Sequence, residues 1–92
     1  MDPYEQTLLA EITLGDEAKK FFNSDIGRFI LGRATEEIDQ ALSEFKDIDP
    51  TDDKGIRNLQ QKIAVAEKLP IWLNECIVEG EQAMAVIDQE EE

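Results

Sequence analysis

The stretch DIDPTDDKG, residues 47–55, has the most closely spaced metal-ligand side chains in the chain, with four aspartates in seven residues. A calcium loop of the EF-hand type takes oxygen ligands at alternate positions, with Gly at its sixth position and a bidentate Glu at its twelfth. Counted from Asp47, the sixth position is Asp52 and the twelfth is Asn58, while Pro50 stiffens the loop. Because both diagnostic positions fail, we predict no metal site here.

The same stretch is well explained as a turn that starts a helix. Pro50 favours an extended Asp49 and ends the preceding helix. Thr51 or Asp52 can then cap the following helix. Carboxylates near the positive end of a helix are stabilised by about 0.3–1 kcal/mol.

Other reactive groups are few. The chain has no histidine, which removes the commonest general base and metal ligand. Glu75 and Glu79 lie one helical turn apart and could act as acid and base, but a solvated acidic face is the commoner meaning of such a pair. Cys76, between Trp72 and Gly80 on an apolar face, is expected to be a structural thiol, with a reactive thiol as the alternative. We predict no enzymatic activity and no cofactor.

Composition describes one small folded domain. The chain has 92 residues, of which 41% are hydrophobic and 34% charged. A domain of this size buries a modest fraction of its surface, and oligomerisation is a usual remedy. No apolar run approaches the roughly 18 residues that span a membrane. A lone cysteine fits a reducing compartment, so we expect a cytoplasmic protein.

The net charge is −13 and is unevenly distributed. Residues 71–92 carry seven acids and no base, whereas residues 54–70 carry four bases. This balance argues against direct binding of nucleic acid and of anionic membranes. The acidity can serve solubility, or it can form a surface that competes for the basic groove of another protein. The candidate acidic surface is Glu75, Glu79, Glu81 and Asp88.

The first 22 residues predict a short N-terminal helical cap. Apolar residues recur at helical spacing up to Leu14, and Gly15 is expected to interrupt the helix. A further turn or two should follow, with Phe21 and Phe22 pointing inward. The next residues, NSD at 23–25, are a capping signal for a new helix.

Residues 25–46 predict a helix with one broad apolar face. Gly27 and Gly32 cost this helix about 1 kcal/mol each relative to alanine, so we expect another backbone to approach them closely. Gly27, Ala34 and Ala41 are seven residues apart and predict a tight seam against a neighbouring helix. The apolar face comprises Ile26, Phe29, Ile30, Ala34, Ile38, Ala41, Leu42 and Phe45.

Residues 53–89 have the clearest helical periodicity, with apolar residues in steps of three and four. We expect a kink at Pro70, because proline lacks the amide that would bond one turn back. The seam comprises Ile56, Leu59, Ile63, Ala66, Pro70, Leu73, Ile77, Gly80, Met84 and Ile87. A second apolar set on the same helix comprises Val65, Leu69, Trp72, Cys76 and Val86.

The short connection between these two helices favours antiparallel neighbours. The predicted fold is therefore all-α: an antiparallel hairpin of residues 25–46 and 53–89 with the N-terminal cap over residues 1–22. The acidic tail, residues 90–92, is expected to fray.

Two stretches, FFNSDIGRFILGRATEEIDQAL and IRNLQQKIAVAEKLPIWLNECIVEGEQAM, resemble a small all-helical protein type found in tailed-bacteriophage genomes. The resemblance covers about residues 20–85 and brings no catalytic motif. It implies a phage origin and expression in a bacterial host, and it leaves open a virion part, an assembly factor or a modulator of the host.

We therefore expect a non-enzymatic phage protein that acts through helix-mediated protein–protein contact, as a homo-oligomer or a virion- or assembly-associated component. Its partner would be itself, or another phage or host protein, in the host cytoplasm or the virion. The alternative is an acidic inhibitor of a host nucleic-acid-binding or defence protein that acts by charge mimicry. The candidate interface is Val65, Leu69, Trp72 and Cys76. For Trp72 alone, the commoner meaning is a packing anchor of the kinked helix, and an interface anchor is the alternative.

Overall fold

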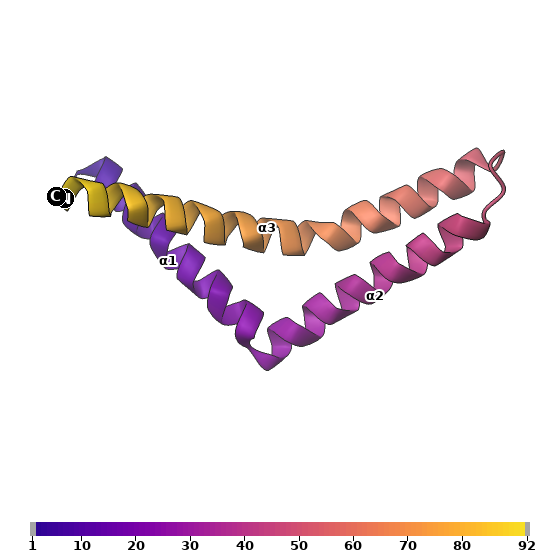
Figure 1. The fold of residues 1–92 in the computed structure, drawn as a ribbon, viewed down its shortest axis with the longest axis horizontal. Helices are drawn as coiled ribbons and strands as arrows, with labels where there is room; N and C mark the ends of the chain where they lie inside the picture. Colours follow the sequence, from indigo (N-terminus) through magenta and orange to yellow (C-terminus); the bar gives the residue numbers. More distant parts are fainter. Residues whose placement is uncertain (1, 92) are drawn as a thin grey trace.

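The computed structural model describes residues 2–91 and contains three helices: α1 (Pro3–Asn23), α2 (Asp25–Asp47) and α3 (Asp53–Glu91). No strand occurs among the described residues, so the all-α prediction is confirmed. Figure 1 shows that α1 and α2 form a V beneath α3. α1 lies along the C-terminal half of α3 and α2 along its N-terminal half, each running opposite to α3.

The V divides the molecule into two arms. We call α1 with residues 71–91 of α3 the terminal arm, since the first and last helical residues, Pro3 and Glu91, lie there (Figure 1). We call α2 with residues 53–70 of α3 the loop arm, since it contains the connection between those helices.

α1 is a continuous helix of 21 residues, so the predicted short cap interrupted at Gly15 is wrong. Asp2 caps its first turn by accepting a hydrogen bond of 2.8 Å from the amide of Glu5, and Pro3 occupies the first turn, where its missing amide costs nothing. Gly15 is buried. Its packing against α3 outweighs the helix propensity that it loses relative to alanine.

A single extended residue, Ser24, forms the corner between α1 and α2. Its hydroxyl accepts from the amide of Gly27 at 3.0 Å, which confirms the predicted capping signal. A side chain at Gly27 would overlap the carbonyl of Phe21, so the expected close backbone approach exists there. At Gly32 it does not, because nothing lies within 4 Å of an added Cβ.

The connection from α2 to α3 comprises residues 48–52. Asp52 accepts from the amide of Gly55 at 2.9 Å and caps α3, as predicted. α3 continues through Pro70 without a break, and its ribbon bends in the middle (Figure 1). The helix extends to Glu91, past the predicted end at Gln89, and Glu92 lies outside the described residues.

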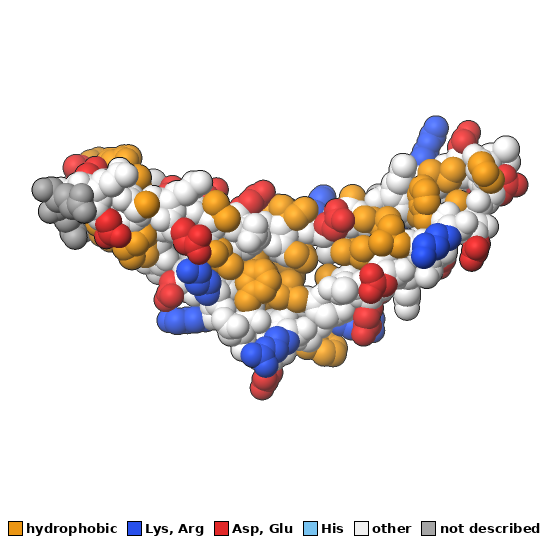
Figure 2. Space-filling model, viewed as in Figure 1, with side chains coloured by type: hydrophobic (Ala, Val, Ile, Leu, Met, Phe, Trp, Pro, Cys, Tyr) orange, Lys and Arg blue, Asp and Glu red, His pale blue; other side chains and the backbone are white. Residues whose placement is uncertain are grey.

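The core is thin. The buried hydrophobic residues are Leu8, Ala18, Ala41, Leu59 and Ala83, of which three are alanines. The radius of gyration is 18.6 Å, whereas a compact domain of this length has one of about 12 Å. The predicted seam of α3 is at least half-buried except at Met84, which is 45% exposed. In Figure 2 apolar side chains gather in the middle of the molecule, between α3 and the corner of the V.

Half of the predicted inward face of α2 is exposed instead. The residues concerned are Ile26, Phe29, Leu42 and Phe45, with exposed fractions of 60%, 65%, 48% and 39%. The predicted small-residue seam does face inward, because Gly27 and Ala41 are buried and Ala34 is half-buried. α2 packs mainly against α3, which covers one narrow stripe and leaves the flanks of the apolar face open.

Substitution by alanine should change the free energy of unfolding in opposite directions at Gly15 and Gly32, because the surroundings of these glycines differ. At Gly15 an added Cβ would lie 2.9 Å from the carbonyl oxygen of Cys76 and 3.1 Å from the Cα of Gly80. We expect Gly15→Ala to lower the free energy of unfolding by roughly 1–3 kcal/mol, since the helices must separate. The matched control Gly32→Ala should raise it by roughly 0.5–1 kcal/mol. Urea denaturation at one protein concentration measures both, and equal effects would contradict the close crossing.

Candidate protein-contact face

An open groove runs between the two helices of the loop arm. It is lined from α2 by Ala34 and Glu37 and from α3 by Asn58, Gln61, Lys62, Val65 and Ala66. Val65 is 61% exposed, although it lines a groove between two helices. The groove therefore contains an uncovered apolar strip formed by Ala34, Val65 and Ala66, with polar side chains along its borders.

Apolar residues extend this groove toward the corner. On α3, Leu69 and Trp72 follow Val65 by four and seven residues, so they lie on the same side of the helix. On α2, Ile26 precedes Glu37 by eleven residues and lies about 20° from it around the helix, whereas Phe29, eight residues before Glu37, is turned about 80° from it and away from Ala34. Leu69 is half-buried and Trp72 is 57% exposed. We define the contact face as Ile26, Phe29, Val65, Leu69 and Trp72.

Three of the four residues predicted for an interface therefore share one side of α3. The fourth, Cys76, is half-buried, and its carbonyl oxygen faces Gly15 at the crossing with α1. It belongs more to the α1–α3 contact than to the open face. Whether the other three meet a partner stays a prediction.

The sequence analysis missed Ile26 and Phe29 as members of this face, because their spacing matched a core stripe. The signal that could have found them is the breadth of the apolar arc on α2. Eight apolar residues surround more of a helix than one neighbouring helix can cover.

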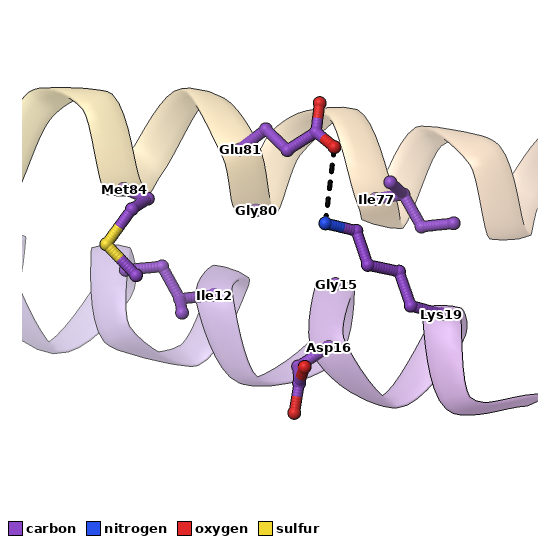
Figure 3. A pocket seen from close by; sticks show the side chains of 8 residues that line it. All are labelled: Ile12, Gly15, Asp16, Lys19, Ile77, Gly80, Glu81 and Met84. Carbon is purple, nitrogen blue, oxygen red and sulfur yellow. Dashed lines mark ion pairs between the residues drawn. The ribbon is translucent and has the colours of Figure 1, made fainter.

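The four predicted acidic residues do not form one surface. Glu75 and Glu79 are exposed one turn apart. Glu81 instead turns toward α1, where its carboxylate lies 3.3 Å from the ammonium of Lys19 (Figure 3). Asp88, seven residues further, shares the side of Glu81. The acids thus lie on two sides of the terminal arm.

The two arms differ clearly in net charge. Residues 1–23 and 71–92, which contain the terminal arm, carry twelve acids and two bases. Residues 24–70, which contain the loop arm, carry ten acids and seven bases. The net charges are therefore −10 and −3, and the contact face lies mainly on the weakly charged arm.

A second hollow lies at the crossing of α1 and α3 (Figure 3) and has a volume of about 250 Å³. The backbones of Gly15 and Gly80 are in close contact at its wall, and the side chains of Ile12 and Met84 lie beside them. The side chain of Asp16 points away from α3. The hollow is a packing gap crossed by the exposed Lys19–Glu81 ion pair rather than a site with convergent polar groups.

In the connection between α2 and α3, the carboxylate of Asp49 accepts hydrogen bonds from a nearby residue of the same loop. One carboxylate oxygen of Asp49 accepts from the amide of Thr51 at 2.9 Å and from the hydroxyl of Thr51 at 2.7 Å. These bonds stabilise the charged form, so the pKa of Asp49 lies below its ordinary value. Within residues 2–91 no group of three or more His, Cys, Asp or Glu side chains could hold a metal ion.

Over the described part of the chain, no helix combines the length and apolar character needed to cross a membrane. Comparison of the chain with protein-family models, with curated proteins and with solved structures found no match. Function is therefore inferred from the geometry and charge of the two arms.

Removal of one hydrogen bond should shift the titration of Asp49. In Thr51→Val the hydroxyl is lost but the amide, the larger cause of the lowered pKa, remains. We expect the pKa of Asp49 to rise part of the way toward its ordinary value. The bonds to Asp49 stabilise the folded state above that ordinary value, and this contribution is lost as pH falls through the lower folded pKa. Carbon-detected NMR titration of the side-chain carboxyl measures the shift, and an unchanged pKa would contradict it.

Proposed function

We propose that this chain is a non-enzymatic bacteriophage protein that acts through helix-mediated contact with other proteins, as a homo-oligomer or an assembly-associated component. The resemblance of residues 20–85 to phage proteins supports the setting, the cytoplasm of a bacterial host or the virion. The contact face carries the rest of the proposal.

The observation that most supports binding is the exposed aromatic and aliphatic surface near the place where the two arms join. Phe29 and Trp72 are 65% and 57% exposed, and Val65 lies beside the groove between the helices. Interfaces are enriched in exposed tryptophan and phenylalanine, and tryptophan is frequent among the residues that dominate binding energy. Several large exposed apolar side chains around one groove support a docking surface for another protein.

The charged groups support binding over catalysis. None of the charged side chains among the described residues is buried. Catalytic acids and bases are usually tuned by burial beside a charged partner within a cleft. The carboxylates here lie on open helix surfaces, which is suited to solubility and electrostatic recognition.

A second candidate function has its own observation. The net charge of −10 on the terminal arm would attract a basic groove, so charge mimicry against a host nucleic-acid-binding or defence protein is the alternative. Glu75 and Glu79 would contribute one edge of that surface, and Glu81 and Asp88 the other. Binding of this kind weakens steeply as salt rises, whereas apolar contact does not.

Truncation of Trp72 tests the contact face. Trp72→Ala should weaken association by tenfold or more while the helix content is kept, because the side chain lies outside the core. Ile71→Ala is the matched control, since Ile71 is 47% exposed but points about 100° away around the helix. Light scattering at low and at high salt reports the mass, and circular dichroism reports helicity.

The outcomes separate the two candidates. A lower melting temperature for Trp72→Ala with no change in mass or binding would mean that Trp72 only packs within the monomer. Binding to a basic partner that disappears at high salt, and is lost in Glu75→Gln with Glu79→Gln but not in Trp72→Ala, would favour charge mimicry.

A further inference from the structure

We infer that the loop arm is half of a four-helix bundle that a second copy of this chain completes. The second copy covers the side of the arm that lies opposite the groove and the contact face. This inference goes beyond the proposed function, because it concerns a different surface and can fail while the contact face stands. It is supported by the apolar rows of α2 and α3, by their register and by the charges of the two arms.

The two flanks of α2 differ in polarity. On the groove side of its small-residue seam, most residues are polar: Arg33, Glu37, Gln40 and Glu44, with Ile26 and Ile30 nearer the corner. The opposite flank carries bulky apolar residues at helical spacing, namely Leu31, Ile38, Leu42 and Phe45. Leu42 and Phe45 remain 48% and 39% exposed, so α3 covers this flank only in part.

α3 has a matching row beside this flank. Ile63 follows the buried Leu59 by four residues and precedes Ala66 by three, so it is turned about 40–60° from these two residues. The turn is in the direction away from Lys62 and Val65 of the groove. Ile56 and Pro70 lie seven residues to either side of Ile63 and continue its row, and all three are half-buried. We define the bundle face as Leu31, Ile38, Leu42, Phe45, Ile56 and Ile63.

The register of α2 on α3 brings the two rows level with each other. Ala41 and Leu59 are both buried, and Ala34 and Ala66 line the same groove. The residue numbers in each of these pairs add to 100. Three apolar pairs add to 101 and therefore lie at levels two helical turns apart: Leu31 with Pro70, Ile38 with Ile63, and Phe45 with Ile56. The middle pair is the midpoint of both rows.

A two-fold axis across the arm at this middle level matches the bundle face to itself. Ile38 and Ile63 of both copies then share one layer. Leu31 of one copy lies over Phe45 of the other, and Pro70 lies over Ile56, so bulky apolar residues meet one another at all three levels. Neighbouring helices are antiparallel throughout, which is the usual arrangement of a four-helix bundle with short connections.

Polar residues between these layers also meet polar residues. Gln60 precedes Ile63 by three residues and Glu67 follows it by four, so the axis sets Gln60 of one copy opposite Glu67 of the other. The side-chain amide of Gln60 can then donate to the carboxylate, and symmetry makes this contact twice. On α2 the axis sets Leu42 over Thr35, whose methyl group is apolar. A matched polar pair among apolar layers fixes the register of a helical bundle.

The same axis keeps the strongest charges apart. It sends the two terminal arms, each of net charge −10, to opposite ends of the dimer, whereas the loop arms that meet carry −3 each. The contact face lies on the outer side of each loop arm and stays exposed. A dimer of this kind therefore presents two contact faces, through which it can bind another protein.

A charge placed on the bundle face tests the second copy. Light scattering should give about twice the 10.4 kDa of one chain at low and at high salt. Leu42→Glu should weaken the dimer by about a hundredfold or more, because it buries an unpaired carboxylate. Circular dichroism should show unchanged helix content, since Leu42 is exposed in the single chain. Leu14→Glu is the matched control and should keep the dimer, since this leucine is 55% exposed on the terminal arm.

Distances between spin labels test the orientation. In a Cys76→Ser background, labels at Asp39→Cys lie about 3 Å apart along the antiparallel α2 helices, and labels at Arg28→Cys lie about 30 Å apart along them. Because the helices are also separated sideways, the label distance should be roughly 20 Å longer at residue 28 than at residue 39. Equal distances at the two positions would overturn the antiparallel bundle.

The outcomes separate this inference from the proposed function. A wild-type protein that stays monomeric at millimolar concentration would overturn the bundle, and so would a dimer that persists in Leu42→Glu. A dimer that dissociates in Trp72→Ala but not in Leu42→Glu would place the second copy on the contact face instead. If Leu42→Glu gives a monomer and Trp72→Ala leaves every interaction unchanged, the bundle stands and the contact face is wrong.

Discussion

The sharp corner at Ser24 determines how the rest of the chain can pack. A single extended residue separates α1 from α2. The amide of Gly27 donates to the Ser24 hydroxyl, and any side chain at Gly27 would overlap the carbonyl of Phe21. With no flexible connection, the two helices cannot fold back to lie side by side along their length. Each must therefore find its apolar partner on α3, at opposite ends of it (Figure 1).

Because α1 and α2 pack against different halves of α3, the fold has two separate helix pairs instead of one three-helix core. A pair of helices buries one stripe from each member, and the positions that become buried are mainly small ones, such as Ala18, Ala41 and Ala83. Close approach at Gly15 and Gly80 adds contact between backbones but little apolar side-chain area. The fold therefore leaves large side chains exposed along its arms, and their burial by another molecule would stabilise it.

Sequence periodicity predicted the helix class and the inward seam of α3, and residue types predicted a cap at Asn23 or Ser24 and another at Thr51 or Asp52. All of these depend on neighbours within a few residues. Periodicity could not predict that α1 would run through Gly15, because the compensating contact with Gly80 lies 65 residues away. Sequence periodicity also assigned Phe29 to the core, because it does not show which distant helix lies near enough to cover that side chain. An apolar stripe shows that a face requires burial, but which helix is near enough to bury it depends on the corner at Ser24.

The acidity and the exposed apolar face have to be considered together. An uncovered surface that includes Phe29 and Trp72 favours indiscriminate association, and a net charge of −13 opposes it. Because most of that charge belongs to the terminal arm, repulsion is strongest for encounters that bring terminal arms together and weakest between loop arms. The charge thus leaves the contact face available while it restricts the orientations in which a second copy can approach. In this way the acidic charge lets the chain keep an exposed apolar face without indiscriminate association.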